Sequence, residues 1–272
     1  MSGFLVESAL LTHGLASISD DRIAEVWHDD WNIAWLESGA LRTGSAEEFI
    51  PFRNAARDFR RINYFTYDEA CRDGWSGPLT ASGTMRACEL TGCSIAVTCG
   101  IGGLRTGQDA EASNDIRSLS VSDVSMIATA FKDMFDTVWS VRAAQREGVD
   151  VFRLTEYWHD GFMFRTGSGG QDAETPGRGR DAAVFAPPAA GKTVCGNALF
   201  LNPVRPEFLI TDTEILEQAV KFGKQQAAEG KAFHPAVNSR IDELTGGRSS
   251  SLQLQSLTDN INLAQNMTVI LR

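Results

Sequence analysis

The stretch VSMIATAFKDMFDTVWSVRAAQREGVDVFR, residues 124–153, predicts a strand, a helix and a second strand in succession. Residues 124–130 are apolar with β-branched members, which is typical of a buried strand. Residues 133–147 carry apolar side chains at helical spacing, so we expect a helix with one face on a core. Gly148 would end that helix, and residues 149–154 would form the next strand.

Lys132 lies between the predicted strand and the predicted helix. Open α/β folds place their chemistry at the carboxyl ends of parallel strands, and this lysine stands at such an end. Its apolar neighbours would partly desolvate the side chain, which disfavours the ammonium form and frees the amine to attack a carbonyl carbon. The other interpretation of the position is a lysine at a helix start with its head in water.

Length and charge narrow the class of protein. The chain has 272 residues and a net charge of −10, which fits one α/β domain over residues 1–272 and argues against a nucleic-acid-binding protein. No apolar run reaches about 18 residues and no secretory signal is recognisable, so we expect no membrane span and a cytoplasmic protein. The five cysteines form no CxxC pair, which indicates reduced thiols.

One polar residue lies inside the first predicted strand and another lies just after it. Residues 4–11 (FLVESALL) have the apolar character of a strand, which Glu7 interrupts. Burying a carboxylate is costly unless it is paired or protonated. Glu7 is therefore either a strand-end side chain in water or an acid with a raised pKa. His13 follows in a turn, where it could reach a ligand or cap the loop.

Further candidate sites lie between residues 53 and 115. The basic run 53–61 predicts a solvated helical face. Residues 79–92 predict a helix whose small first residues, Thr80 and Ala81, would let a ligand approach the backbone amides. A tight contact between helix and sheet explains the same small residues equally well.

A glycine turn follows the strand predicted over residues 94–99. Residues 100–103 (GIGG) could offer amides to an anion, but they do not form GxGxxG, because Arg105 stands at the last glycine position. The polar stretch that follows predicts a loop containing Asp115. A lone aspartate in a loop is usually a cap, and it could instead hold a hard cation such as Mg²⁺ or Mn²⁺.

The whole pattern predicts an α/β fold with a central, mostly parallel sheet sandwiched between helices. Residues 167–193 are rich in Gly, Pro and Ala and predict a surface excursion or lid. The AGKT at residues 190–193 is not a P-loop, because the first glycine position of that motif falls on Ala186. The remaining predicted helices cover residues 20–27, 213–229, 235–244 and 252–268.

Six stretches together resemble the pseudouridine-5′-phosphate glycosidase family. They are residues 5–14 (LVESALLTHG), 82–103 (SGTMRACELTGCSIAVTCGIGG), 114–116 (NDI), 128–149 (ATAFKDMFDTVWSVRAAQREGV), 201–208 (LNPVRPEF) and 231–247 (KAFHPAVNSRIDELTGG). The resemblance implies a central sheet between helices and a homotrimer. It also implies an enzyme that reversibly joins C1′ of ribose 5-phosphate to uracil with a divalent cation, typically Mn²⁺.

The resemblance implies roles for individual residues. Lys132 matches the family's nucleophilic lysine, which forms an imine with C1′ of the opened ribose. Glu7 matches the proton-donating glutamate, and Asp115 matches the metal-binding aspartate. His13 and Asn260 match a family histidine and a family asparagine that lie among the substrate-binding residues.

This sequence departs from the family mainly at residues that would surround the sugar-activating residues and contact the substrate. Arg61 stands where the family has a second lysine, and Arg105 replaces the family's histidine after GIGG. Arg117 begins a replaced Ser-Ala-Asp segment, and Gln253 replaces an asparagine. Arginine binds phosphate bidentately, so Arg61, Arg105 and Arg117 could still hold ribose 5-phosphate.

The residues that would activate the sugar match the family, whereas the residues that would contact the rest of the substrate differ from it. This combination favours one function over two others. We expect a C-glycosynthase or C-glycosidase that keeps ribose 5-phosphate and uses a heterocyclic or aromatic acceptor other than uracil, as in C-nucleoside antibiotic biosynthesis. One alternative is a housekeeping pseudouridine-5′-phosphate glycosidase. The other is a catalytically retired homologue that binds a sugar phosphate.

Overall fold

A computed structural model describes residues 3–15, 17–104, 112–155, 161–165, 194–231, 233–267 and 269–270. Arg105 and the predicted lid at 167–193 lie outside the described residues. Within the described part of the chain, no helix is long and apolar enough to cross a membrane. Cys71, Cys88, Cys93 and Cys99 are free thiols, as predicted for them.

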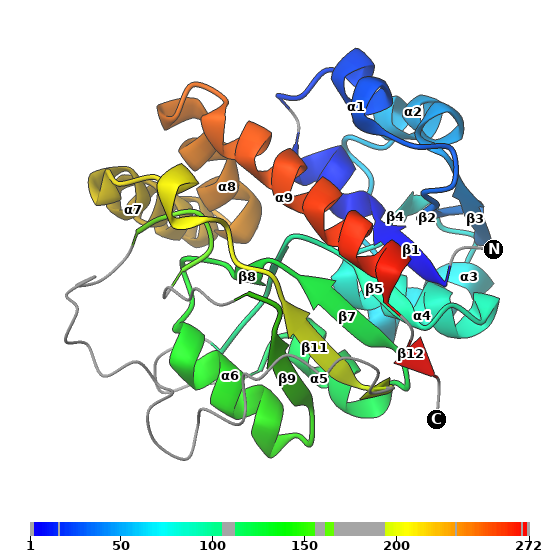
Figure 1. Cartoon of the computed structure of the whole chain (residues 1–272). Coiled ribbons are helices and arrows are strands. Elements are labelled where there is room, and N and C mark those ends of the chain that lie inside the picture. Colours follow the sequence, from blue (N-terminus) through cyan, green and yellow to red (C-terminus); the bar gives the residue numbers. More distant parts are fainter. Residues whose placement is uncertain are drawn as a thin grey trace.

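A central, mostly parallel sheet organises the chain, which confirms the predicted α/β fold (Figure 1). Its strand order is β3-β2-β1-β5-β7-β11-β9, and β4 pairs with β2. The β2–β3 and β2–β4 pairs are antiparallel and the other pairs are parallel. The strands are β1 (Phe4–Glu7), β2 (Ile33–Glu37), β3 (Ala40–Gly44), β4 (Gly77–Pro78), β5 (Ile95–Val97), β7 (Ser125–Ala128), β9 (Asp150–Arg153) and β11 (Ala198–Leu201).

Two short parallel pairs lie outside that sheet. β6 (Gly100–Ile101) pairs with β8 (Ala130–Phe131), so the chain beyond β5 and the chain beyond β7 stay side by side. β10 (Val194–Cys195) pairs with β12 (Val269–Ile270) near the C-terminal end. The β6–β8 pair brings the glycine turn next to Lys132, whose amide donates to Ile101 O at 3.0 Å.

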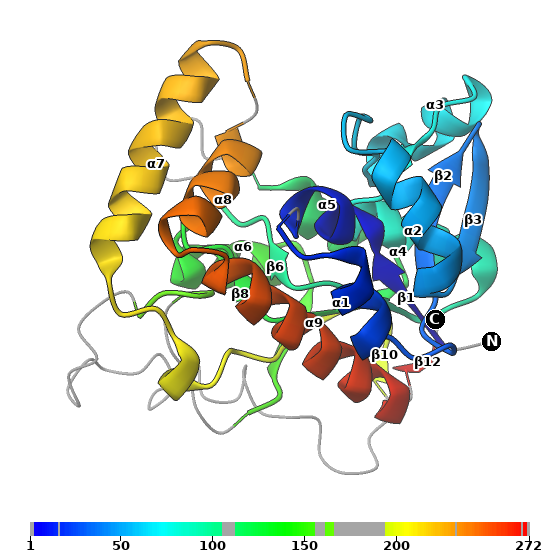
Figure 2. The ribbon, with the colours of Figure 1, turned by 90° about the horizontal axis from the view of Figure 1, so that it is seen from above.

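Helices cover both faces of the sheet (Figures 1 and 2). Strand side chains alternate between the faces, so Val6 packs towards α9 while Leu5 packs towards α4. One core contains residues of α1, α2, α8 and α9, and the other contains residues of α3, α4, α5 and α6. The helices are α1 (Asp20–Val26), α2 (Ala46–Ala55), α3 (Tyr67–Arg72), α4 (Ala81–Thr91), α5 (Asn114–Val121), α6 (Thr137–Arg146), α7 (Thr213–Ala228), α8 (Phe233–Leu244) and α9 (Arg248–Asn266), with short helical turns at Leu10–Gly14, Tyr64–Thr66 and Pro206–Phe208.

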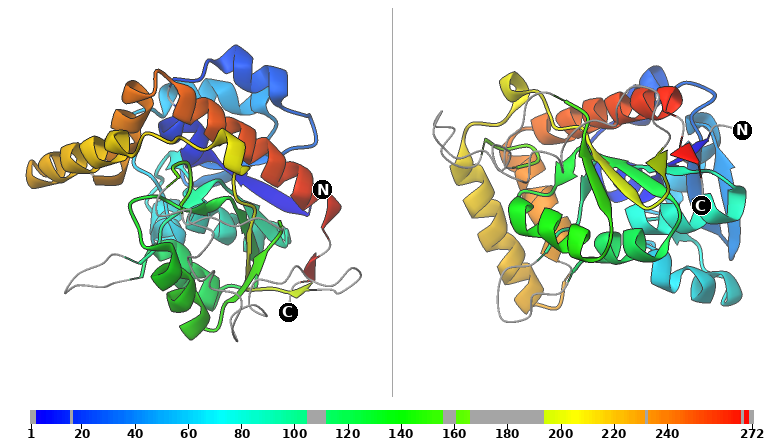
Figure 3. Two further views of the ribbon diagram at one scale, coloured as in Figure 1. Left: turned by 60° about the vertical axis from the view of Figure 1, so that its left-hand side comes forward. Right: turned by 60° about the horizontal axis from the view of Figure 1, so that its bottom comes forward.

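α7 packs against α8 and extends away from the sheet (Figure 3). Gly223 of α7 permits this contact, because a Cβ there would collide with Val237 and lie 3.0 Å from the ring of Phe233. The first turn of α8 is therefore held by its neighbour helix as well as by its own packing.

Three predictions of secondary structure are wrong, and side-chain hydrogen bonds explain the difference in each case. The first strand ends at Glu7 rather than at residue 11, because the Ser8 hydroxyl donates to Ala34 O at 2.5 Å and accepts from Leu79 N at 2.8 Å. The helix predicted over residues 133–147 begins at Thr137, where Asp136 caps it by accepting from Trp139 N. Asp115 lies in the first turn of α5 and not in a loop, because Ser113 caps that helix.

The predicted solvated face over residues 53–61 is wrong for Arg53, which is 3% exposed. Its guanidinium donates to the carbonyl oxygens of Leu11, Leu15 and Ile18 at 2.8–2.9 Å and pairs with Asp20. Arg53 therefore holds the segment between β1 and α1 onto α2. Because these hydrogen bonds join residues that lie 35 to 42 positions apart in the sequence, a local charge pattern could not reveal them.

We predict that Arg53→Met destabilises the protein by about 3 kcal/mol, because three buried carbonyl groups lose their donor. Arg57→Met is the matched control, since Arg57 is exposed on the same segment, and we expect a change below about 0.5 kcal/mol. Urea unfolding followed by circular dichroism measures both values. Equal stability of the two variants would contradict the role given to Arg53.

Candidate active site

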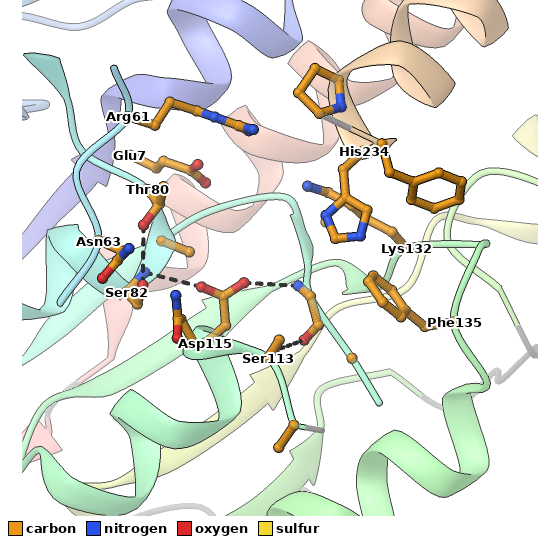
Figure 4. A pocket seen from close by; sticks show the side chains of 18 residues that line it. Glu7, Arg61, Asn63, Thr80, Ser82, Ser113, Asp115, Lys132, Phe135 and His234 are labelled. Carbon is orange, nitrogen blue, oxygen red and sulfur yellow. Dashed lines mark hydrogen bonds between the residues drawn. The ribbon is translucent and has the colours of Figure 1, made fainter. Parts of the chain in front are cut away.

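A cavity of about 560 Å³ lies at the carboxyl ends of β1 and β5. The strand order reverses there, because β1 pairs with β2 on one side and with β5 on the other. Such a switch point is where open α/β sheets form ligand crevices. Of the residues singled out in the sequence, Glu7, Lys132, Asp115, Arg61, Thr80 and Ala81 line this cavity (Figure 4).

Glu7 is the last residue of β1, and its carboxyl group faces the cavity (Figure 4). Burial raises the pKa of Glu7 to about 7, although the nearby ammonium of Lys132 and the hydrogen bond from Thr98 oppose that shift. Thr98 follows β5 and donates its hydroxyl to the carboxyl group. Glu7 can therefore both hold and release a proton near neutral pH.

Lys132 directly follows β8, and its side chain enters the cavity between Glu7 and His234 (Figure 4). A Cβ on Gly100 would lie 3.0 Å from the Cγ of Lys132 and 2.7 Å from the ring of Phe162. Gly100 thus lies directly against the stem of the lysine, and the amine is directed into the cavity (Figure 4).

Asp115 joins three parts of the cavity wall. Its Oδ1 accepts from Ser82 N at 3.2 Å and its Oδ2 accepts from Gly102 N at 2.8 Å. Ser113 adds a hydrogen bond from its hydroxyl to Gly102 O at 2.7 Å. The start of α5 is therefore fixed to the start of α4 and to the glycine turn.

The start of α4 offers one backbone donor to the cavity. Ser82 N is used by Asp115, and Gly83 N is used by the hydroxyl of Thr80, which caps the helix. Among the described residues Ala81 N has no such partner, and Ala81 lines the cavity. An anion bound there would meet this amide, the positive end of the helix dipole and the guanidinium of Arg61.

The same cavity residues could hold a divalent cation only through Asp115 and water molecules. Within the described part of the chain, no group of three or more His, Cys, Asp or Glu side chains is arranged to hold a metal. Each oxygen of Asp115 accepts one amide and keeps further lone-pair capacity. A hydrated Mg²⁺ or Mn²⁺ with Asp115 as its protein carboxylate ligand fits this arrangement, since such ions retain several waters.

Three predicted site residues lie away from the cavity lining. His13 donates from Nε2 to Arg57 O at 3.0 Å, and burial together with the charge of Arg61 lowers its pKa. The guanidinium of Arg117 lies 4.5 Å from the ring centroid of Phe65 on the surface. Asn260 is fully buried and donates to Thr98 O at 2.7 Å and to Thr129 Oγ1 at 3.0 Å.

Sequence patterns did not predict the aromatic side of the cavity. Phe135, Phe233, His234 and Pro235 line it, and they come from two segments about 100 residues apart. The apolar spacing assigned Phe135 to the core, and nothing local distinguished His234. Only the packing of α8 beside residues 133–136 brings these side chains together.

Comparison with known proteins identifies the family. The family described as "Indigoidine synthase A like protein" matches residues 36–270. A pseudouridine-5′-phosphate glycosidase from Roseobacter denitrificans is 25% identical over 279 residues, covering 95% of this chain and 87% of that protein. A pseudouridine-5′-phosphate glycosidase from Fervidobacterium nodosum is 28% identical over 284 residues, covering 95% and 90%.

Two crystal structures share the fold. An indigoidine synthase A (IdgA)-like protein from Thermotoga maritima gives a TM-score of 0.72 at 19% identity, over 98% of this chain and 92% of that one. The prealnumycin C-glycosynthase AlnA, in complex with ribulose 5-phosphate, gives 0.68 at 20% identity, over 96% and 89%. The predicted resemblance is thereby confirmed, and this chain is an enzyme that belongs to the indigoidine synthase A-like family.

Proposed function

We propose that the residues lining the cavity catalyse the formation or cleavage of the C–C bond between C1′ of ribose 5-phosphate and a heterocyclic or aromatic acceptor. The observation that carries this proposal is the amine of Lys132 next to a carboxyl group, Glu7, whose pKa is about 7. The relatives support it, because they include pseudouridine-5′-phosphate glycosidases, and so does the structural neighbour that is a C-glycosynthase. The homotrimer expected from the family stays a prediction.

Lys132 would make C1′ electrophilic. Its amine condenses with the C1′ aldehyde of the opened sugar and releases one water, which gives an imine. A nucleophilic ring carbon of the acceptor attacks C1′ of that imine, and the same carbon then loses its proton. The sugar hydroxyl finally displaces the amine from C1′ and closes the ring. Cleavage runs through the same steps in reverse.

Glu7 would move the proton in the ring-opening and ring-closing steps. As the carboxylic acid it donates to the ring oxygen when the sugar opens, and as the carboxylate it accepts the hydroxyl proton when the sugar closes. Both forms are available near neutral pH because burial places the pKa at about 7. The hydroxyl of Thr98 orients the carboxyl group for this transfer.

Arg61, Thr80 and Ala81 would bind the phosphate, and Asp115 would hold a hydrated divalent cation. The guanidinium and the helix start supply a charge and a backbone donor on one side of the cavity. A bound cation would orient water and sugar oxygens. Asp115 itself keeps the start of α4 and the glycine turn together around the sugar.

We predict that borohydride traps a ribose 5-phosphate adduct on Lys132, located by intact-mass and peptide mass spectrometry. The adduct should be absent in Lys132→Ala, because the attacking amine is missing. Lys231→Ala is the matched control, since Lys231 is exposed and pairs with Glu229, and it should be trapped like the wild type. An adduct that persists in Lys132→Ala, or no adduct in the folded wild type with Mn²⁺, would contradict the proposal.

We predict that the rate of adduct formation falls as the pH rises through about 7, because deprotonated Glu7 cannot donate to the ring oxygen. Glu7→Gln should lose this limb of the pH profile and react about 100-fold more slowly or worse. The rate of adduct trapping by cyanoborohydride, measured from about pH 5.5 to about pH 8.5, reports both effects. If the rate of Glu7→Gln still fell with the same midpoint pH, the pH dependence would belong to another titrating group.

A further inference from the structure

The two sides of the cavity differ in chemistry (Figure 4). Arg61, Thr80 and Ser82 form a polar side near Glu7 and Asp115. The opposite side is formed by Phe135, Phe233, His234 and Pro235, which we call the aromatic wall. Lys132 lies between the two sides (Figure 4). A molecule bonded to the amine could therefore place one part on each side.

The aromatic wall is fixed to the backbone that carries Lys132. Phe135 N donates to Lys132 O at 2.9 Å, so a tight turn sets the ring three residues beyond the amine. The Phe135 side chain is 9% exposed, and a Cβ on Gly103 would lie 2.9 Å from its Cβ. The ring can therefore move little when a ligand enters.

The second half of the aromatic wall comes from the first turn of α8. The ring of His234 meets Phe135 edge-on, with centroids 5.1 Å apart, and meets Phe233 at 5.4 Å. α7 supports Phe233 from behind through the close approach at Gly223. This network of ring contacts holds the imidazole at the cavity.

The composition of the aromatic wall does not suit a phosphate. It contains no lysine or arginine, and Pro235 removes one of the backbone donors that the start of a helix normally offers to an anion. The polar side has the guanidinium of Arg61 and the free amide of Ala81. The sugar phosphate is thus assigned to the polar side, which leaves the aromatic wall for the other reactant.

We propose that the aromatic wall is the acceptor subsite and that it takes a planar, uncharged aromatic ring. The ring packs against Phe135, since aromatic pairs favour offset or edge-on contact. His234 forms a hydrogen bond to a hydroxyl or carbonyl group on that ring and so determines specificity. This inference rests on the proposed function, because it names the reactant that would meet the sugar imine.

The test uses 1,5-dihydroxynaphthalene, a fluorescent two-ring phenol, and follows its binding by fluorescence anisotropy. Phe135→Ala and His234→Ala should each raise the dissociation constant about tenfold, because a ring contact or a hydrogen bond is lost. Phe135→Leu and His234→Gln, which keep bulk or hydrogen-bonding capacity, should recover part of the loss. Phe208→Ala is the matched control, since Phe208 is 49% exposed and does not line the cavity, and it should bind like the wild type.

Trapping of ribose 5-phosphate on Lys132 separates this inference from the proposed function. No adduct in the wild type would overturn the proposed function, whereas the anisotropy result judges the aromatic wall by itself. Unchanged probe affinity in Phe135→Ala and His234→Ala would overturn the acceptor subsite.

Discussion

Burial of the Glu7 carboxyl group is the constraint on which the rest of the site depends. A carboxyl group enclosed by protein must be hydrogen-bonded or protonated. Thr98 donates to it, and Asn260 of α9 in turn donates to Thr98 O at 2.7 Å while accepting from Asn202 at 2.9 Å. The residue that follows β11 and the last helix, α9, therefore help to fix a side chain on the first strand. The same enclosure raises the pKa of Glu7 to about 7, so one physical cause both organises the fold and prepares proton transfer.

This network gives Asn260 a positioning role. The family resemblance placed it among substrate-binding residues, whereas its amide group here joins the chain beyond β5 to Thr129 beyond β7. The ends of these two strands carry the glycine turn and Lys132 into the cavity. An asparagine can thus support the site from behind the residues that would touch the sugar.

Local chemistry made much of the fold predictable from the sequence. The strand, helix and strand around Lys132 follow from apolar spacing and from Gly148, which ends the helix with a positive φ. Arg53, His234 and the surroundings of Asp115 could not be predicted in this way. Each depends on contacts between distant segments, such as the hydrogen bond from Gly102 N to Asp115, and no local pattern encodes them. The roles proposed for Glu7 and Lys132 came from the family resemblance, because spacing alone left them open.

A crystal structure of the protein soaked with ribose 5-phosphate at neutral pH would show whether Lys132 forms a covalent bond with the sugar. We predict continuous electron density from the Nζ of Lys132 to C1′ of an opened sugar. We also expect the phosphate at Arg61 and the start of α4, with the aromatic wall left free. Sugar phosphate bound without a bond to Lys132, or with its phosphate against Phe135 and His234, would contradict these predictions.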